Sequence, residues 1–502
     1  MIYRIDQVKL KLNESIDSIP EKIATKVGID KVEEYTIIKE SIDARDKSNI
    51  LKVYSVDFAC DKKLRLNQAP DMSYHQVKAN PSWENRPRPV VVGFGPAGMF
   101  AALILAQAGV KPIVLERGSD VDTRMEKVDH FWRTGELDEN SNVQFGEGGA
   151  GTFSDGKLTT GIKDVRIRKV LEEFVNHGAG KEILYEAKPH IGTDVLRFVV
   201  KGLREEIRAL GGDVIFNAKV VGIESEDGKV VGLKYIETET EKKIETDTAI
   251  FAIGHSARDT FRYLNKIGIE MTQKPFSIGV RIEHPQDMID IAQYGKPARE
   301  LGLPAATYKV NHRCENGRGV YTFCMCPGGH VIVASSENGA VVTNGMSYHK
   351  RDSGVANSAL LVDVRTSDFG SDDVLAGVEF QEKYERLAYK NGGSNYKPPK
   401  CTWGELKLDK APQVSGSLPE FAVSAMKEAM PHLGRKIKGF DDDDAVITAT
   451  ETRSSSPVRF ARDEHYEGSL KGFYPVGEGA GYAGGIMSAA VDGIKVAEEV
   501  LV

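Results

Sequence analysis

A short apolar strand that runs into a glycine-rich turn constrains this sequence more than any other feature. Val90-Val-Val92 is a β-branched run, typical of a strand buried on both faces of a parallel sheet. It leads directly into Gly93-Phe-Gly95-Pro-Ala-Gly98, and we expect a helix from there to about Ala108. Pro112–Glu116 has the pattern of the next strand. This order of strand, turn, helix and strand predicts an α/β fold with a parallel sheet.

The turn has the spacing of a dinucleotide-phosphate site. Gly93 permits a tight turn, Gly95 lets backbone amides approach a pyrophosphate at the helix N-terminus, and Gly98 allows close packing of helix on strand. Pro96 suits the first helical turn, where its missing N–H loses no partner. Glu116 ends the following strand, where its carboxylate can accept hydrogen bonds from a ribose diol. The sequence therefore predicts an adenosine-diphosphate site here.

A second glycine block, near the C-terminus, favours FAD over a nicotinamide dinucleotide. Gly472–Gly493 has the pattern of strand, turn and helix, and Glu478 at the strand end can bind a ribityl hydroxyl. The helix beginning near Gly484-Gly485 can present its N-terminus to the flavin N1/C2=O edge, where negative charge develops on reduction. Asp247–Gly254, a buried strand ending in glycine, is expected to pass under the cofactor, with His255 nearby.

The sequence predicts several segments around these motifs. Residues 1–65 have the pattern of a small βαββ module of balanced charge, which favours a packing or partner role over RNA binding. Residues 66–88 are polar and proline-rich, as a linker would be. We expect a Rossmann-type FAD-binding domain in two parts, residues 89–273 and 416–502, interrupted by an α+β substrate domain at residues 274–415.

Composition excludes several classes of protein. The 502 residues carry a net charge of -7, which gives no electrostatic footprint for nucleic acid or an acidic membrane. No apolar run approaches the roughly 18 residues that a membrane span needs, and the first residues lack the pattern of a secretion signal. Five scattered cysteines do not suggest a disulfide framework. We expect a cytoplasmic protein without a metal site; the Asp441–Asp444 run has the pattern of a solvated loop.

The three cofactor segments, in this order, resemble the glutathione-reductase-like flavoprotein superfamily. More closely, the chain resembles the bacterial FAD-dependent, or NAD(FAD)-utilizing, dehydrogenases. The stretches that carry this resemblance are Glu147–Leu158, Cys326–Gly329, Glu451–Arg459, Ser41–Arg45 and the C-terminal glycine block. The resemblance implies FAD and an oxidoreductase, and it implies that the loop of residues 147–158 lies over the pyrophosphate and beside the isoalloxazine. Glu478 departs from the Asp of many superfamily members.

The predicted FAD contacts lie in these glycine-rich segments and on their flanks. They are Gly93, Gly95, Pro96, Ala97, Gly98, Glu116, Arg117, Gly149, Gly151, Ser154, Gly156, Lys157, Val220, Gly254, Gly477, Glu478, Gly485 and Ile486. Candidate catalytic residues are Lys157, which could steady the flavin N1/C2=O edge or a substrate anion, together with Arg281 and Arg453. Arg281, Tyr348, Arg351 and Arg453 are candidates for substrate contacts, because arginines beside flavins can clamp carboxylates.

Cys324 and Cys326 follow an apolar strand at residues 320–323. A redox dithiol would suit a flavoprotein, but the C-x-C spacing argues against one. It leaves alternate side chains on one face of a strand, whereas flavin disulfide reductases use longer spacings. We expect these two cysteines to line the core or a pocket.

The function that this sequence predicts is hydride exchange between flavin N5 and a small-molecule substrate. No second Gly-x-Gly-x-x-Gly follows a buried strand, so NAD(P)H or another donor is expected to dock only transiently. Two alternatives stay open. One is an FAD-dependent monooxygenase, and the other is a flavin-binding interaction module in which FAD is structural.

Overall fold

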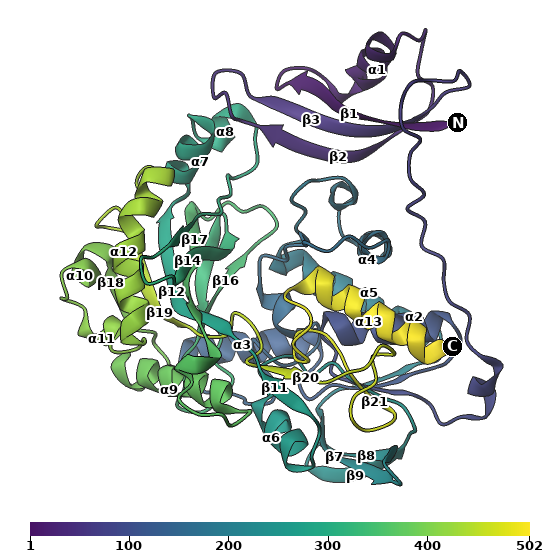
Figure 1. The fold of residues 1–502 in the computed structure, drawn as a ribbon, viewed down its shortest axis with the longest axis vertical. Helices are drawn as coiled ribbons and strands as arrows, with labels where there is room; N and C mark the ends of the chain where they lie inside the picture. The colour runs from purple at the N-terminus through teal and green to yellow at the C-terminus, as the bar shows by residue number, and fades with distance from the viewer.

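The computed structural model describes residues 1–502, and the first 60 of them form a small layer at one end of the molecule (Figure 1). Three antiparallel strands, β1 (Ile2–Lys11), β2 (Tyr35–Asp43) and β3 (Leu51–Ala59), pair in the order β1-β3-β2. Helix α1 (Ile19–Val27) packs on this sheet and ends at Gly28, whose positive φ of 73° suits glycine. The predicted order of strand, helix, strand and strand is therefore present.

A five-stranded parallel sheet forms the centre of the molecule. Its order is β21 (Phe473–Pro475), β10 (Ala249–Phe251), β4 (Val90–Val92), β5 (Ile113–Leu115) and β6 (Asp213–Ile215). Helix α2 (Pro96–Gln107) is buried on nearly every side, because α13 (Ile486–Leu501) and α5 (Thr193–Ala209) pack around it. An apolar helix surrounded by other elements explains the unbroken hydrophobic sequence of α2. Figure 1 shows α13, in yellow, beside α2.

A six-stranded antiparallel sheet forms the second large unit. Its order is β13 (Asn311–Arg313), β14 (Gly319–Cys326), β17 (Val355–Val364), β12 (Phe276–Pro285), β19 (Val446–Glu451) and β18 (Lys400–Thr402). Helices α10 (Trp403–Lys407), α11 (Pro412–Ser415) and α12 (Glu420–Lys436) bury a common apolar core against it. Because α12 and β19 belong to this unit, it extends to Glu451, beyond the boundary at residue 415 that the sequence suggested.

Smaller elements connect the two units. Three short sheets comprise β7 (Ala218–Glu226), β8 (Lys229–Glu237) and β9 (Thr240–Glu245); β11 (Met271–Gln273) and β20 (Val458–Phe460); and β15 (Gly329–Val333) and β16 (Thr343–Ser347). The remaining helices are α3 (Val121–Thr134), α4 (Arg166–Asn176), α6 (Arg258–Lys266), α7 (Gln286–Tyr294), α8 (Ala298–Leu301) and α9 (Ala376–Asn391). None of the helices combines the length and the apolar character needed to cross a membrane.

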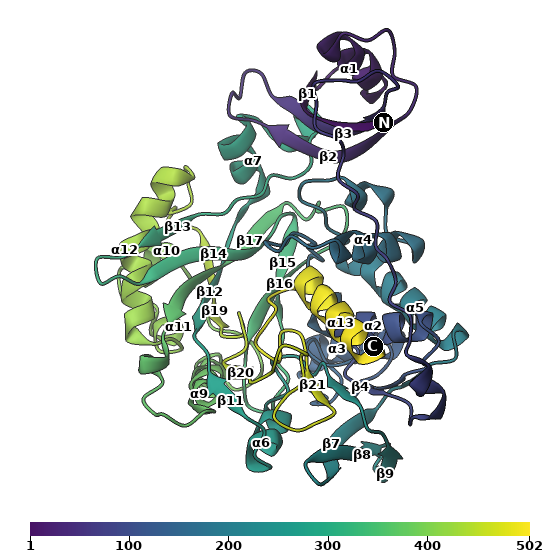
Figure 2. The ribbon, with the colours of Figure 1, turned by 45° about the vertical axis from the view of Figure 1, so that its right-hand side comes forward.

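The N-terminal module joins both large units (Figure 2). Along the edge of β2, the Glu40 N–H donates to the Tyr185 carbonyl at 2.7 Å, and the Ala187 N–H donates to the Glu40 carbonyl at 2.8 Å. On the other side, Ile50 packs with Ala298 and Leu303 near α8. The module therefore fixes the segment around residue 187 relative to the six-stranded sheet unit.

Candidate functional site

The turn between β4 and α2 is shaped by two glycines that have no room for a side chain. Gly93 has a positive φ of 97°, and a Cβ there would lie 2.5 Å from the Ala252 carbonyl oxygen. A Cβ on Gly98 would lie 2.0 Å from the Gly93 carbonyl oxygen. Gly95 differs, because a Cβ there would meet only the Gly149 Cα, at 3.7 Å. Gly95 therefore faces open space at the N-terminus of α2.

Glu116, at the end of β5, ties three loops together. Its carboxylate accepts hydrogen bonds from the N–H groups of Phe94 at 2.7 Å, Gly118 at 2.9 Å and Gly146 at 3.0 Å. Two of these bonds go to Oε1 and one to Oε2, so Oε2 keeps an acceptor site. The contact of Glu116 with a ribose stays a prediction, while its role in fixing the glycine turn is a structural observation.

The loop of residues 147–158 covers the N-termini of α2 and α13. A Cβ on Gly151 would lie 3.2 Å from Ile486, the first residue of α13. The loop is held from behind by Arg124 on α3, a fully buried residue whose guanidinium donates to the carbonyls of Glu147 at 2.6 Å and Gly149 at 3.0 Å. Sequence reasoning missed Arg124, because it did not anticipate α3.

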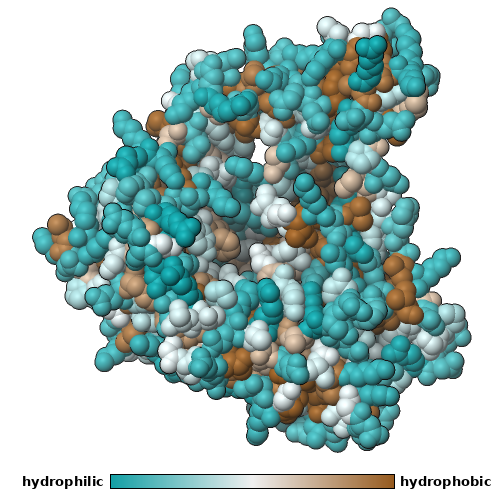
Figure 3. Space-filling view, in the orientation of Figure 1, coloured by the Kyte–Doolittle hydropathy of each residue, from teal (hydrophilic) through white to brown (hydrophobic).

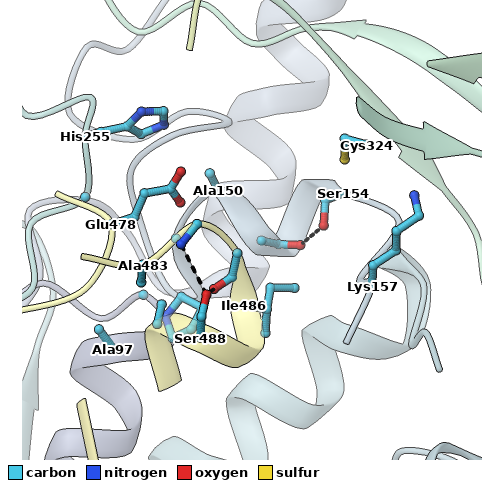
Figure 4. Close-up of a pocket in the computed structure, with 18 of the residues that line it drawn as sticks. Ala97, Ala150, Ser154, Lys157, His255, Cys324, Glu478, Ala483, Ile486 and Ser488 are labelled. Atoms are coloured by element: carbon cyan, nitrogen blue, oxygen red, sulfur yellow. Dashed lines mark hydrogen bonds between the residues drawn. The ribbon is translucent and has the colours of Figure 1, made fainter. Parts of the chain in front are cut away.

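Glu478 follows β21 and projects its carboxylate into the space between α13 and the loop carrying His255 (Figure 4). Its oxygens have no hydrogen-bond partner in the protein, and burial raises the pKa of this carboxyl to about 7, although Lys274 opposes the shift. Gly477 packs beneath, where a Cβ would lie 2.8 Å from the Ala97 Cβ. An unpartnered carboxylate that faces a cavity is suited to accept hydrogen bonds from a ligand hydroxyl.

These segments enclose one continuous cavity of about 1300 Å³. It is lined by the predicted FAD contacts except Gly98 and Gly477, which are used for helix packing. From the glycine turn the cavity continues to β14 of the six-stranded sheet, where Phe323, Cys324 and Met325 form its wall. The surface of the molecule is hollowed near the centre of the view in Figure 3, beneath the N-terminal module.

The candidate catalytic residues differ in their access to this cavity. Lys157 lines it, and its ammonium donates to the Met325 carbonyl and lies 3.3 Å from Asp155. Arg453 also lines it, but its guanidinium is held by the buried Glu385 at 2.8 Å. Burial works against ionisation of Glu385, yet Arg258 and Arg453 hold the pKa of that carboxyl well below its usual range.

Arg281 and Tyr348 lie outside the cavity lining, which corrects their predicted role as substrate contacts. Arg281 is completely buried in the six-stranded sheet, where it forms an ion pair with Glu451. Tyr348 is 47% exposed on the surface. Arg351 does line the cavity, but its guanidinium is bound to Asp155. Its Nε and Nη2 donate to the two carboxylate oxygens at 2.9 and 2.5 Å.

Two further ionisable groups in the cavity wall have shifted pKa values. Burial raises the pKa of Glu451 to about 7 even though Arg281 lowers it. Desolvation and the nearby Arg453 lower the pKa of His255 to about 4, so its imidazole is neutral at physiological pH. Shifted groups gathered around one cavity are typical of a functional site.

Comparisons with known proteins relate the chain to flavoproteins. A family model described as "FAD-dependent protein, C-terminal domain-like" matches residues 275–417 and 406–454, and a domain of unknown function matches residues 1–59. A protein of Clostridium beijerinckii described as "Uncharacterized protein" is 47% identical over 530 residues, and the match covers 100% of this chain and 99% of that protein.

Among solved structures, a flavin-dependent brominase aligns with a TM-score of 0.41 at 13% identity, over 83% of this chain and 79% of that one. An FAD-complexed glycerol-3-phosphate dehydrogenase from Bacillus halodurans aligns with a TM-score of 0.37 at 14% identity, over 82% of this chain and 63% of that one.

Proposed function

We propose that this chain, which belongs to a family of FAD-dependent flavoproteins together with its Clostridium beijerinckii relative, is an oxidoreductase acting on a small-molecule substrate. The match to the model of an FAD-dependent protein's C-terminal domain supports FAD as the cofactor. The observation that carries the proposal is the single cavity that joins the glycine turn at Gly95 to the wall formed by β14. A cofactor and a substrate can meet in such a cavity without leaving the protein.

The residues present fit FAD. Gly95 faces open space at the N-terminus of α2, where backbone N–H groups can receive a pyrophosphate. Glu478 offers an unpartnered carboxylate to a ribityl hydroxyl, and the N-terminus of α13 lies in the same wall. Placement of the flavin ring toward Lys157 and β14 completes the proposed arrangement, in which the parallel-sheet unit is a glutathione-reductase-like FAD domain and the antiparallel unit is the substrate domain.

The bound flavin supplies the redox chemistry by exchanging a hydride at N5. The protein contributes position, charge and exclusion of water. Phe323 and Met325 form an apolar wall for a substrate, and Lys157 places a positive charge beside it. Glu451, which also lines the cavity, is held by the Arg281 guanidinium through both carboxylate oxygens.

Two alternatives follow from the same cavity. A monooxygenase would consume oxygen in a substrate-coupled way, and an interaction module with structural FAD would show no turnover. The transient docking of NAD(P)H or another donor, expected from the absence of a second nucleotide fingerprint, belongs to the proposal as well.

An anaerobic screen of donors and substrates tests the proposal. The visible absorbance of oxidised flavin in the holoprotein should bleach with at least one donor and return with an acceptor at turnover-like rates. Oxygen consumption coupled to substrate would favour the monooxygenase. A flavin that no donor reduces would contradict the oxidoreductase and favour the structural role.

A further inference from the structure

Strand β14 leaves regular geometry at Cys324, where it lines the cavity. Its pairing with β17 is in register up to Phe323 and resumes in a shifted register at Cys326. Cys324 itself has a φ of 43°, which a residue with a side chain adopts at an energetic cost. Conformations of this kind are concentrated at functional sites, because the surrounding structure must hold them.

The bulge turns the Cys326 side chain back toward Cys324. The Cys326 Sγ donates to the Cys324 carbonyl oxygen at 3.3 Å. Residues two apart are at most about 7 Å apart between Cα atoms, close to the upper end of the range that a disulfide spans. The expectation from the C-x-C spacing assumed a regular strand, and the bulge removes that assumption.

Two cations surround the pair. The Lys157 ammonium donates to the carbonyl of Met325, the residue between the two cysteines, and the Arg281 Nη1 donates to the Cys324 carbonyl at 3.0 Å. Figure 4 shows Cys324 and Lys157 on the same side of the cavity, away from Glu478. Arg281, which the sequence placed on the substrate, instead supports the bulge from inside the sheet.

The hydrogen bond from Cys326 lowers the pKa of the Cys324 thiol well below its usual value, with Lys157 and Arg281 adding to this effect and burial opposing it. The same contact, together with burial, raises the pKa of Cys326. The pair therefore combines a thiol that lines the cavity and ionises more readily with a thiol that is enclosed behind it and keeps its proton. A low-pKa thiolate next to a second thiol is the arrangement that thiol–disulfide chemistry requires.

We propose that Cys324 and Cys326 are a redox-active dithiol that exchanges two electrons with the FAD of this cavity. This inference rests on the proposed function. When the S–S bond forms, the Cys324 thiolate and the Cys326 thiol together release two electrons and the Cys326 proton. Oxidised flavin takes up the two electrons and that proton and becomes its anionic reduced form. The reverse transfer breaks the S–S bond and restores the thiolate and the thiol.

The other three cysteines serve as controls. Cys60, Cys314 and Cys401 are free and do not line the cavity. Burial raises the pKa of Cys314 to about 11 and that of Cys401 to about 12, so neither thiol is reactive at neutral pH. Cys314→Ser is the matched variant, because a serine hydroxyl can replace its donor contact with the Ala425 carbonyl.

The test is an anaerobic dithionite titration of the air-oxidised holoprotein, combined with alkylation and mass spectrometry of its five cysteines. The wild type should consume about four electrons per FAD, because a disulfide and a flavin each take up two. Cys324→Ser and Cys326→Ser should consume about two, and Cys314→Ser should behave as the wild type does. The oxidised wild type should have two fewer alkylated cysteines than the reduced wild type, and both of these cysteines should lie in the peptide containing residues 324–326.

The experiment distinguishes failure of the dithiol proposal from failure of the proposed oxidoreductase function. Full flavin bleaching at about two electrons, with all five thiols alkylated in the oxidised wild type, would overturn the dithiol and leave the oxidoreductase intact. A disulfide at 324–326 in a protein whose flavin no substrate reduces would support the dithiol and contradict the oxidoreductase. The thiol count needs only the wild type, so it stands even where a serine variant does not fold.

Discussion

Gly149 packs directly against Gly95, so that a Cβ on Gly149 would lie 3.0 Å from the Gly95 Cα. The loop that closes the cavity and the turn at the N-terminus of α2 are therefore built against each other without intervening side chains. Arg124 binds the loop through the Gly149 carbonyl, and Glu116 binds the turn through the Phe94 N–H. A ligand phosphate at Gly95 would thus be contacted by a turn that the protein has already ordered.

The first prediction is that the purified protein is yellow and that its flavin is FAD rather than FMN. The glycine turn and Glu116 form an adenosine-diphosphate site, which FMN has no group to fill. Chromatography of the flavin released by denaturation identifies it. Recovery of FMN, or of no flavin, would contradict the assignment of this site.

The second prediction compares two glycines of the turn. Gly95→Val should fold but lose FAD, because its side chain enters the open space that the pyrophosphate needs. Gly98→Val should fail to fold, because even its Cβ would lie 2.0 Å from the Gly93 carbonyl oxygen. Circular dichroism measures the folding of both variants, and their flavin content measures the retention of FAD. Full FAD occupancy in Gly95→Val would mean that the phosphate binds elsewhere.

The third prediction concerns the C-terminal turn. Glu478→Ala should weaken FAD binding by about tenfold to a hundredfold, the effect of losing one hydrogen bond to a charged group. A negative charge at the N-terminus of α13 should instead lower the reduction potential of the flavin, since that helix end favours the anionic reduced form.

Gly485→Asp would be strained, because Gly485 has a φ of 144°. Gly484→Asp is the better variant, because a Cβ there meets nothing within 4 Å and the residue has no left-handed φ. Potentiometric titration of Glu478→Ala and Gly484→Asp measures the reduction potential of the flavin in each variant. A larger shift of the reduction potential in Glu478→Ala than in Gly484→Asp would contradict the placement of the α13 N-terminus at the isoalloxazine edge.

The fourth prediction concerns pH and the apoprotein. Glu478 has a pKa of about 7 when folded and 4.5 as its reference value, so the folded state binds more protons between these values. The free energy of unfolding of wild-type apoprotein should therefore fall as the pH rises from about 5 to about 8, and Glu478→Gln should lack this contribution.

At pH 8 the Gln variant should be more stable relative to the wild type than at pH 5, by about 1–3 kcal/mol. Urea denaturation of both apoproteins at the two pH values measures the difference. An unchanged difference between the two proteins would show that the Glu478 carboxylate is well solvated.

The local motifs of the parallel-sheet unit could be predicted from sequence because their signals are local. Val90–Val92, the glycine turn and α2 follow one another in the chain, and the helical spacing of apolar residues marks α5. The segment after α5 forms two strands, β6 and β7, and no local signal marks the point where the chain changes from one sheet to the other.

The six-stranded sheet could not be predicted in this way. Its central strand β17 is buried on both faces, so no alternation of apolar and polar residues marks it. Its neighbour β12 pairs with β19, far away in the chain, and no local pattern specifies that pairing. The ion pair of Arg281 with Glu451 depends on it, which is why sequence reasoning placed Arg281 on a substrate.

The bulge at Cys324 could not be predicted from the sequence either. A regular strand and a bulged one have the same apolar composition here, and the positive φ falls on a cysteine rather than on a glycine that would mark it. The candidate FAD contacts could be assigned because they recur at fixed spacings, whereas the arrangement of thiols and cations beyond them arises only from tertiary structure.

The long separation in sequence between β21 and α13 on one side and β4 and α2 on the other has a consequence for the order of folding. Strand β21 and helix α13 supply an edge strand of the parallel sheet and a wall of the cavity, and α13 covers α2. The antiparallel unit separates them in sequence from β4 and α2, so their pairing closes a long loop and is expected to form late in folding. FAD retention is therefore expected to follow that step, with α2 lacking its apolar cover until then.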